Sequence, residues 1–367
     1  IGSHMAGKLA LYFPRLELII SYIQFGIDTP YPPLINRFKS YLLSCWYQVK
    51  SYLENDDKKE VAAVYGIIDQ MGHTFLNTIP GYENFAEESK LQQLDRVLVG
   101  NSVFMDIGKI FPEEITTEKL THNMGDKWQL FKNILERQCM SFLISQNPLY
   151  ITEKLAERIY VAASKNCKNS APSFQQELEE AQKCSPLILF QLRVDKRLWS
   201  NQIEGTASII SSLYSDFPNL GIILDGWSCK ETGNHPQDEL AIEKEKITAN
   251  QIISMIPGDV KTYITIGHNL YEKVLWAKAI DLFVASWGSN LTVFSHIVNK
   301  PGVAYGNSYW LEHIRELKAW SARENYIRPI LVESNAVKDR IPNNAGSSYT
   351  LQWQAIYRVV TQLITKN

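Results

Sequence analysis

A regular alternation of short apolar runs and amphipathic helices occupies the second half of the chain, and it constrains the fold more than any other feature. Strands are expected at 187–193, 221–225, 260–266, 281–286, 302–305 and 327–332, with helices at 207–214, 239–256, 271–279 and 350–365. Runs that are apolar throughout and separated by helices predict a parallel sheet covered on both faces. With right-handed crossovers, this half is expected to be Rossmann-like.

The first half carries a smaller version of the same pattern. Strands are expected at 61–69 and 96–100, and helices at 34–53, from 72 onwards, at 128–144 and at 152–164. A polar segment rich in Ser, Asn and Lys, 165–183, separates the two halves. The predicted fold class is therefore α/β, with two Rossmann-like domains that face a cleft and extra helices at the N-terminus.

Composition excludes several classes of protein. The 367 residues and 45% apolar content suffice for two cores. A formal net charge of −2 provides no overall basic field for nucleic acid. The five cysteines are Cys45, Cys139, Cys167, Cys184 and Cys229. An odd number without Cys-x-x-Cys spacing argues against a disulfide framework or a zinc site and favours a reducing, cytoplasmic location.

The N-terminal residues are set apart from the fold. The sequence Gly-Ser-His-Met at 2–5 reads as the remnant of an expression tag, so His4 is no candidate for a site. No apolar run reaches the roughly 18 residues that span a bilayer. The apolar stretch 9–22 contains Pro14, Arg15 and Glu17. We expect it to be a helix packed on the domain, with peripheral association at the inner face of the membrane as the alternative.

The segment 281–292 is the strongest candidate for a binding site. A buried strand breaks at small residues around Gly288, and a helix then begins. The first turn of a helix has unpaired N–H donors and a positive dipole end, which suit an anion. In α/β sheets, ligands bind beyond the carboxyl ends of the strands. The candidate donor-binding residues here are Ser286, Trp287, Gly288, Ser289, Asn290 and Thr292.

The ends of three other strands carry further candidates. Three cations, Arg193, Lys196 and Arg197, follow the 187–193 strand and would suit a diphosphate, although a solvated loop with internal ion pairs is the alternative. The next strand ends at Asp225, where a carboxylate can accept hydrogen bonds from sugar or ribose hydroxyls or merely cap the turn. Trp227 could stack on a ring. The third ends near His268, which could contact a nucleotide or be an ordinary loop histidine.

A histidine in the first half is the main catalytic candidate. His73 follows the first strand and lies on the first turn of a predicted helix. A neutral imidazole there would suit the removal of a proton from an attacking hydroxyl, and a core or capping histidine is the alternative. Asp106 and Glu83 are the other carboxylate candidates for a base.

Two motifs resemble glycosyltransferase family 61 and its bacterial relatives. Residues 70–77, Gln-Met-Gly-His-Thr-Phe-Leu-Asn, resemble the family's histidine segment, and residues 286–292, Ser-Trp-Gly-Ser-Asn-Leu-Thr, resemble its late glycine-containing loop. The family's late loop begins with a histidine, in place of which Ser286 and Trp287 stand here, and Asn77 occupies a position where an acid is usual. The resemblance implies a GT-B fold and an inverting, metal-independent reaction.

From the sequence we hypothesise that the protein is a glycosyltransferase. It would move a sugar from a nucleotide-sugar donor to a hydroxyl of a glycan, lipid-linked saccharide or protein, as in polysaccharide biosynthesis, with no metal and no cofactor besides the donor. Retention of configuration stays open. The alternative is a non-catalytic glycan-binding or scaffold subunit that uses its 41 aromatic residues (9 Trp, 18 Tyr, 14 Phe) for stacking. This chain has no Gly-x-Ser-x-Gly elbow, which argues against a hydrolase. It also has no early glycine-rich fingerprint, which a nucleotide-sugar epimerase would carry.

This hypothesis assigns a role to each segment of the chain. We expect a tag remnant at 1–5, an N-terminal helical segment at 6–60, an acceptor-side α/β domain at 61–164, a linker at 165–183, a Rossmann-like donor domain at 184–345 and a C-terminal helix at 346–367.

Overall fold

The computed structural model describes residues 2–3, 8–13, 18–22, 31–55, 57–120, 127–145, 150–168, 172–289, 291–313 and 323–366. The chain divides into two compact units. One comprises residues 1–57 and 135–137, and the other comprises residues 58–134 and 138–367. The larger unit contains both of the parallel sheets that the sequence predicts, and it is the unit that carries the candidate site.

The smaller unit begins with strands rather than with the expected helix. Strands β1 (Gly2–Ser3), β2 (Lys8–Phe13) and β3 (Leu18–Tyr22) form an antiparallel sheet, followed by helices α1 (Tyr31–Ser44) and α2 (Trp46–Glu54). The expectation of a helix over 9–22 is therefore wrong. The two apolar runs on either side of Pro14 are rich in β-branched and aromatic residues, and they pair with each other, Leu11 opposite Ile20. Proline disfavours one continuous helix, and pairing satisfies both backbones.

The first sheet of the larger unit has four parallel strands in the order β6-β5-β4-β7. They are β4 (Val61–Tyr65), β5 (Arg96–Val99), β6 (Thr117–Lys119) and β7 (Met140–Leu143). The expected helix over 128–144 holds only in its first part, as α6 (Lys127–Glu136). The remainder becomes β7, because its backbone pairs along β4, with Phe142 opposite Ala63. Hydrogen bonding to β4 therefore determines the structure of residues 140–143, although their apolar residues recur at helical spacing.

Helices connect the strands of this sheet and lead from it to the second sheet. A continuous helical stretch follows β4 and consists of α3 (Met71–His73), a π-helical turn η2 (Thr74–Thr78) and α4 (Ile79–Glu87). The expected helix from residue 72 is thereby confirmed. The other elements are η3 (Leu91–Gln93), α5 (Ile107–Ile110), α7 (Glu153–Cys167) and α8 (Pro172–Ala181). Helix α8 lies within the segment expected to be a linker, and its Phe174 and Ala181 belong to the core.

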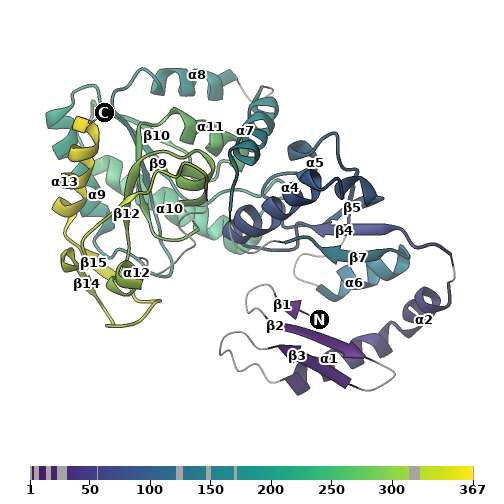
Figure 1. Cartoon of the computed structure of the whole chain (residues 1–367). Helices are drawn as coiled ribbons and strands as arrows, with labels where there is room; N and C mark the ends of the chain where they lie inside the picture. Colours follow the sequence, from purple (N-terminus) through teal and green to yellow (C-terminus); the bar gives the residue numbers. More distant parts are fainter. Residues whose placement is uncertain are drawn as a thin grey trace. The chain divides into compact units, whose positions relative to one another are not determined.

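The second sheet has six parallel strands in the order β10-β9-β8-β11-β12-β13, which is the Rossmann order. They are β8 (Leu187–Gln191), β9 (Gly221–Asp225), β10 (Lys261–Ile264), β11 (Leu282–Ser286), β12 (Gly302–Tyr305) and β13 (Ile330–Leu331). All six were expected from the apolar runs. The predicted fold class, α/β with two Rossmann-like halves, is confirmed by the two parallel sheets (Figure 1).

The second sheet is covered on both faces. Its helices are α9 (Gln202–Asp216), α10 (Pro236–Met255), α11 (Leu270–Ala279), the π-helical turn η4 (Thr292–Ile297), α12 (Ser308–His313) and α13 (Trp353–Lys366), with smaller elements η7 (Ser334–Ala336), β14 (Val337–Asp339) and β15 (Tyr349–Leu351). Helices α10 and α13 both pack on α9. Among the described residues, no helix is both long and apolar enough to cross a membrane.

Alternating side chains of the central strands enter two different cores. In β8, Leu187 and Leu189 face the core that also contains α7 and α11, whereas Ile188 and Phe190 face the core of α9, α10 and α13. The first of these cores continues to Tyr65 of the other sheet. One apolar core therefore joins the two halves, which accounts for their single compact unit.

Candidate functional site

One pocket of about 600 Å³ lies between the two sheets of the larger unit. The first half contributes Asp69, Gln70, Met71, Gly72, His73, Leu76, Asn77 and Phe104. The second half contributes Gln191, Arg193, Asp195, Arg197, Gly226, Trp227, Ser228, Glu245, Trp287, Gly288, Ser289 and His296. A volume of this size suits a small organic ligand.

The second half forms its wall of the pocket from the carboxyl ends of three adjacent strands. Gln191 ends β8, Trp227 follows β9, and Ser289 follows β11. The strand order reverses beside β8, which pairs with β9 on one side and β11 on the other. Such a reversal leaves a crevice at the carboxyl ends, where open α/β sheets bind their ligands.

Two arginines follow β8 and line this wall. Arg193 donates from Nε to Asp195 Oδ1 at 3.1 Å, and its side chain is largely buried. Arg197 has its guanidinium carbon 5.7 Å from the centre of the Trp310 ring. Burial, and then the charge of Arg193, lower the pKa of Arg197 below its ordinary value. The charges of Arg193 and Arg197 thus lie on one partly buried wall, with Asp195 paired to Arg193. An anionic ligand there would reduce the repulsion between the two arginines.

The loop after β11 brings its backbone close to Arg197. Gly288 has φ +133°, a conformation that L side chains rarely adopt, and a Cβ there would lie 3.5 Å from Arg197 Nη2. Arg197 itself has φ +61°, which is uncommon for a residue with a side chain. Two residues with positive φ therefore line the pocket, with the side chain of Arg197 beside Gly288, and such conformations are frequent at functional sites.

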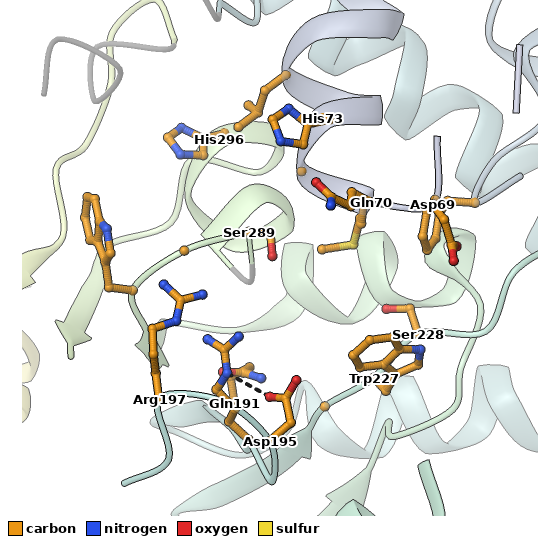
Figure 2. Close-up of a pocket in the computed structure, with 18 of the residues that line it drawn as sticks. Asp69, Gln70, His73, Gln191, Asp195, Arg197, Trp227, Ser228, Ser289 and His296 are labelled. Atoms are coloured by element: carbon orange, nitrogen blue, oxygen red, sulfur yellow. Dashed lines mark hydrogen bonds and ion pairs between the residues drawn. The ribbon is translucent and has the colours of Figure 1, made fainter. Parts of the chain in front are cut away.

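The first half forms the opposite wall with its helical stretch after β4. Figure 2 shows His73 across the pocket from Arg197 and Asp195. His73 Nδ1 lies 3.0 Å from Asn77 Oδ1, one turn further along, which fixes the orientation of the imidazole ring. A Cβ on Gly72 would lie 2.9 Å from Ser289 Cβ. Glycine at 72 thus permits the close approach of the two walls beside His73.

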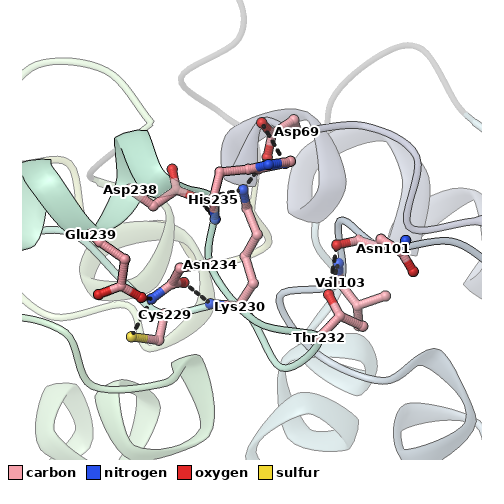
Figure 3. A network of polar contacts seen from close by, with 10 residues as sticks. All are labelled: Asp69, Asn101, Val103, Cys229, Lys230, Thr232, Asn234, His235, Asp238 and Glu239. Atoms are coloured by element: carbon pink, nitrogen blue, oxygen red, sulfur yellow. Dashed lines mark hydrogen bonds and ion pairs between the residues drawn. The ribbon is translucent and has the colours of Figure 1, made fainter. Parts of the chain in front are cut away.

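A loop of the second half, between β9 and α10, holds the rim of the pocket. Lys230 Nζ lies 2.5 Å from Asp69 Oδ1 and 2.7 Å from Asp238 Oδ2, with only 1% of its side chain exposed. Thr232 Oγ1 donates to Asn101 O at 2.7 Å and accepts from Val103 N. Figure 3 shows these contacts, in which the loop before α10 binds the first half and Asp238 of α10 accepts from Lys230 Nζ.

Seven of the residues predicted for the site line this pocket, namely His73, Arg193, Arg197, Trp227, Trp287, Gly288 and Ser289. Predicted residues from both halves of the sequence, up to 216 positions apart (289 minus 73), therefore surround one cavity. Asn290 lies outside the described residues.

Other predicted donor-site residues lie elsewhere. Lys196 is exposed and is not among the described residues of the pocket wall. Asp225 is buried, with Oδ1 2.8 Å from Lys273 Nζ and accepting from Thr265 Oγ1 at 2.7 Å, so its hydrogen-bonding capacity is used inside the protein. Ser286 donates to Gln191 Oε1 at 3.1 Å, and Thr292 is fully buried.

His268 and the two carboxylate candidates also lie away from the described pocket wall. His268 Nδ1 is 3.5 Å from Glu272 Oε2, and burial lowers the pKa of His268. Glu83 is buried in α4, where both carboxylate oxygens lie 2.8 Å from Thr152 Oγ1. Asp106 caps α5 and accepts from Gly108 N at 2.8 Å. Of the three catalytic candidates, His73 is the one found among the described residues that line the pocket.

Four titratable residues that line the pocket had no predicted binding or catalytic role: Asp69, Asp195, Glu245 and His296. Glu245 of α10 is buried, and burial raises its pKa to about 7. His296 of η4 is buried and stacks on Tyr326, with ring centroids 5.2 Å apart. Burial, and then the charge of Arg323, lower its pKa to about 4. A glutamate in mid-helix and a histidine one turn into a helix give no sequence signal of exposure to a cavity.

The residues that the structure describes contain no group of three or more His, Cys, Asp or Glu side chains arranged to hold a metal ion. The polar groups of the pocket instead combine two arginines, an imidazole opposite them and two carboxylates of the second half, Asp195 and Glu245. This combination can hold an anion on one wall and accept a proton on the other.

Comparison with known proteins adds similarity of structure without similarity of sequence. No protein family model matches the chain, and no curated protein matches it. Among solved structures, the ADP-heptose lipopolysaccharide heptosyltransferase II of E. coli has a TM-score of 0.45 at 12% identity, over 83% of this chain and 99% of that one. A family 9 glycosyltransferase of Veillonella parvula has a TM-score of 0.42 at 9% identity, over 84% and 98%.

An enzyme of another class is similar as well. The UDP-GlcNAc 2-epimerase of Neisseria meningitidis, solved with UDP-GlcNAc bound, has a TM-score of 0.37 at 11% identity, over 83% of this chain and 91% of that one. With TM-scores below 0.5, these similarities carry no conclusion about the activity of this chain.

Proposed function

We propose that the protein is a glycosyltransferase that takes a sugar from a nucleotide-sugar donor and passes it to a hydroxyl. One observation carries this proposal: Arg193 and Arg197 line the same pocket as His73, on the opposite wall. Cations suited to a diphosphate thus face a base suited to an attacking hydroxyl, with room for a sugar between them.

The second half would hold the donor. Arg197, beside the open backbone of Gly288, would bind the diphosphate, and Arg193 would join it by exchanging Asp195 for a phosphate oxygen. An arginine binds phosphate through two parallel N–H donors, which fixes the orientation of the group as well as its charge. Trp227 and Trp287 would then enclose the nucleoside or the sugar ring.

The first half would present the acceptor and the base. His73 would take the proton of the acceptor hydroxyl as its oxygen bonds to the anomeric carbon, and the bond from that carbon to the diphosphate oxygen would break. The departing diphosphate carries the negative charge, which the two arginines would stabilise. Attack from the wall opposite the diphosphate would invert the anomeric configuration, and no metal ion takes part in this scheme. An inverting, metal-independent reaction is also what the resemblance to family 61 implies.

For the acceptor we propose only that it supplies a hydroxyl, because the pocket residues favour no particular class of acceptor. A glycan, a lipid-linked saccharide or a protein each supplies the hydroxyl that the scheme requires. For a lipid-linked acceptor, the protein would work at the inner face of the membrane as a peripheral enzyme.

The test has two stages. Calorimetry against UDP, GDP, ADP and CMP, followed by the corresponding nucleotide sugars, should find one nucleotide that binds. If none of these compounds binds at millimolar concentration, the proposal of a donor site is wrong. A donor and acceptor screen with mass-spectrometric detection should then find a glycosylated product that forms only when an acceptor is present.

The same screen separates the rival classes. Binding of a glycan without nucleotide release in the presence of any donor would support a non-catalytic glycan-binding or scaffold subunit. An altered nucleotide sugar, formed from the donor alone, would indicate an epimerase. Either result would overturn the transferase proposal.

A further inference from the structure

The turn that carries Trp227 into the pocket is held from two different helices. Lys273 of α11 donates from Nζ to Gly226 O at 2.6 Å and to Trp227 O at 3.0 Å. Glu245 of α10 accepts from Trp227 N through Oε2 at 2.5 Å. Both polar groups of the Trp227 backbone are thus tied to charged side chains. The Trp227 side chain itself stays partly exposed on the pocket wall.

Glu245 fits closely beneath this turn. A Cβ on Gly226 would lie 2.1 Å from Glu245 Oε2, so the absence of a side chain at 226 leaves the space that the carboxylate occupies. Glu245 is 4% exposed and lines the pocket. The contact between Glu245 and Trp227 is therefore built into the packing of α10 against the end of β9.

Charged groups of three elements face Glu245. Lys273 of α11 favours its charged form, while Asp225 at the end of β9 and Asp195 after β8 disfavour it. Lys273 is already paired with Asp225 at 2.8 Å. Burial outweighs the attraction to Lys273 and raises the pKa of Glu245 to about 7. Ordinary changes of pH near neutrality therefore change the charge of a group that holds the pocket wall.

We propose that Glu245 is a positioning residue whose ionised carboxylate holds the Trp227 turn against the pocket and whose protonation loosens it. A hydrogen bond to an ionised acceptor is about twice as strong as one to a neutral acceptor. Above neutral pH the Trp227 N–H is held by ionised Glu245, while Lys273 Nζ and the Gly267 N–H donate to Trp227 O. Below neutral pH the bonds to Trp227 O stay and the bond to Glu245 weakens. The shape of the wall at Trp227 then follows the charge of a residue that does not itself stack on a ligand.

The inference about Trp227 holds for the free protein, and its consequence for the donor rests on the proposed function. With a nucleoside or sugar ring on Trp227, the two states of the turn would present two different surfaces to the donor. Glu245 would thus act on donor binding through Trp227.

The experiment follows Trp227 in the absence of any ligand. The protein is labelled with 5-fluorotryptophan, the Trp227 resonance is assigned by its loss in Trp227→Phe, and its fluorine chemical shift is recorded from pH 5.5 to 8.5. The expected result is one transition with a midpoint near the pKa of about 7 given by burial of Glu245. Glu245→Gln, which mimics the neutral acid, should keep the low-pH position of the signal throughout.

Matched variants make the assignment specific. Glu243 is an exposed carboxylate on the same helix, and Glu243→Gln should leave the transition unchanged. Glu245→Asp keeps an ionisable group but shortens its reach, so it should reduce the transition even if Glu245→Gln does not fold. A transition that persists in Glu245→Gln, that disappears in His73→Gln or His268→Gln instead, or that is absent from the parent protein would overturn the proposal.

This readout is independent of catalysis. If the protein shows the transition but binds no nucleotide, the proposed role of Glu245 is supported and the proposed function is wrong. If it binds a nucleotide but shows no transition, the donor site is supported and the proposed role of Glu245 is wrong.

Discussion

The guanidinium of Arg197 lies 3.5 Å from the position that a Cβ atom would take on Gly288. These residues follow different strands, β8 and β11, which are neighbours in the second sheet. Because residue 288 has no side chain, a phosphate could approach the backbone there while it contacts the Arg197 guanidinium.

Replacing Arg197 by alanine should weaken the binding of a nucleotide diphosphate. A hydrogen bond to a charged group contributes roughly 1.5–3 kcal/mol, which corresponds to an increase in Kd of about 10- to 150-fold. Lys196→Ala is the matched control, because it removes one positive charge from the same loop at an exposed position. Calorimetry on both variants measures the difference. Equal losses would mean that only the general field of the loop matters and that Arg197 makes no contact with the ligand.

His73→Gln should slow sugar transfer while leaving donor affinity unchanged. A general base contributes roughly 10²- to 10⁴-fold to a rate, and glutamine keeps much of the size and polarity of histidine without its basicity. The control is His313→Gln, a histidine exposed on α12. Turnover is measured at saturating donor and acceptor, and donor Kd by calorimetry. Undiminished turnover would remove His73 from the mechanism, and a fall in donor affinity would reassign it to binding.

The two α/β halves and the residues at their strand ends could be predicted because each strand is indicated by a short continuous stretch of sequence. Each apolar run of the second sheet, such as 221–225, is long enough for one strand and is bounded by turn residues. Once the strands are parallel, topology brings their carboxyl ends together, so Arg193 and Gly288 had to share one edge. No contact between side chains is needed for that inference.

Prediction failed where the outcome depends on partners distant in sequence. Asp225 has the position of a ligand-binding carboxylate, but Lys273, 48 residues later (273 minus 225), neutralises it in the interior. Glu245 belongs to a helix in which charged residues appear at many positions, and only the packing of α10 beneath Gly226 turns it towards the pocket. Segment 140–143 has helical spacing, yet an open edge at β4 made it a strand.

Lys230→Met should destabilise the larger unit strongly. Both Lys230 and Asp238 have side chains less than 10% exposed, so removing the cation leaves a buried carboxylate without its ion pair. Breaking a buried pair in this way costs about 3–5 kcal/mol in the free energy of unfolding. Urea denaturation measures this loss. Asp69→Asn is the control, because Asp69 is half exposed and its pair with Lys230 should contribute about 1 kcal/mol or less.

A second substitution tests the cause of that loss. Lys230→Met combined with Asp238→Asn should recover much of the stability, since the buried charge is then absent. Similar losses in Lys230→Met and Asp69→Asn would instead assign the effect to the contact between the two halves.

Replacing His296 should change how stability depends on pH. Burial, together with the nearby charge of Arg323, lowers the pKa of His296 from 6.5 to about 4 in the folded protein. Between these two values the unfolded chain binds a proton that the folded chain does not, so stability falls as the pH falls from 6.5 to 4. The difference of about 2.5 units corresponds to roughly 3 kcal/mol, lost in full only below both pKa values.

His296→Gln should therefore flatten the decline of the unfolding free energy between pH 6.5 and 4, whatever its effect on stability at pH 8. The quantity that decides is the slope, measured by urea denaturation at half-unit steps of pH. His313→Gln provides the control, because its imidazole is exposed and should leave the slope as it is. An unchanged slope in His296→Gln would mean that His296 accepts its proton as readily in the folded protein as in the unfolded chain. That outcome would be incompatible with its burial against Tyr326 on the wall of the pocket.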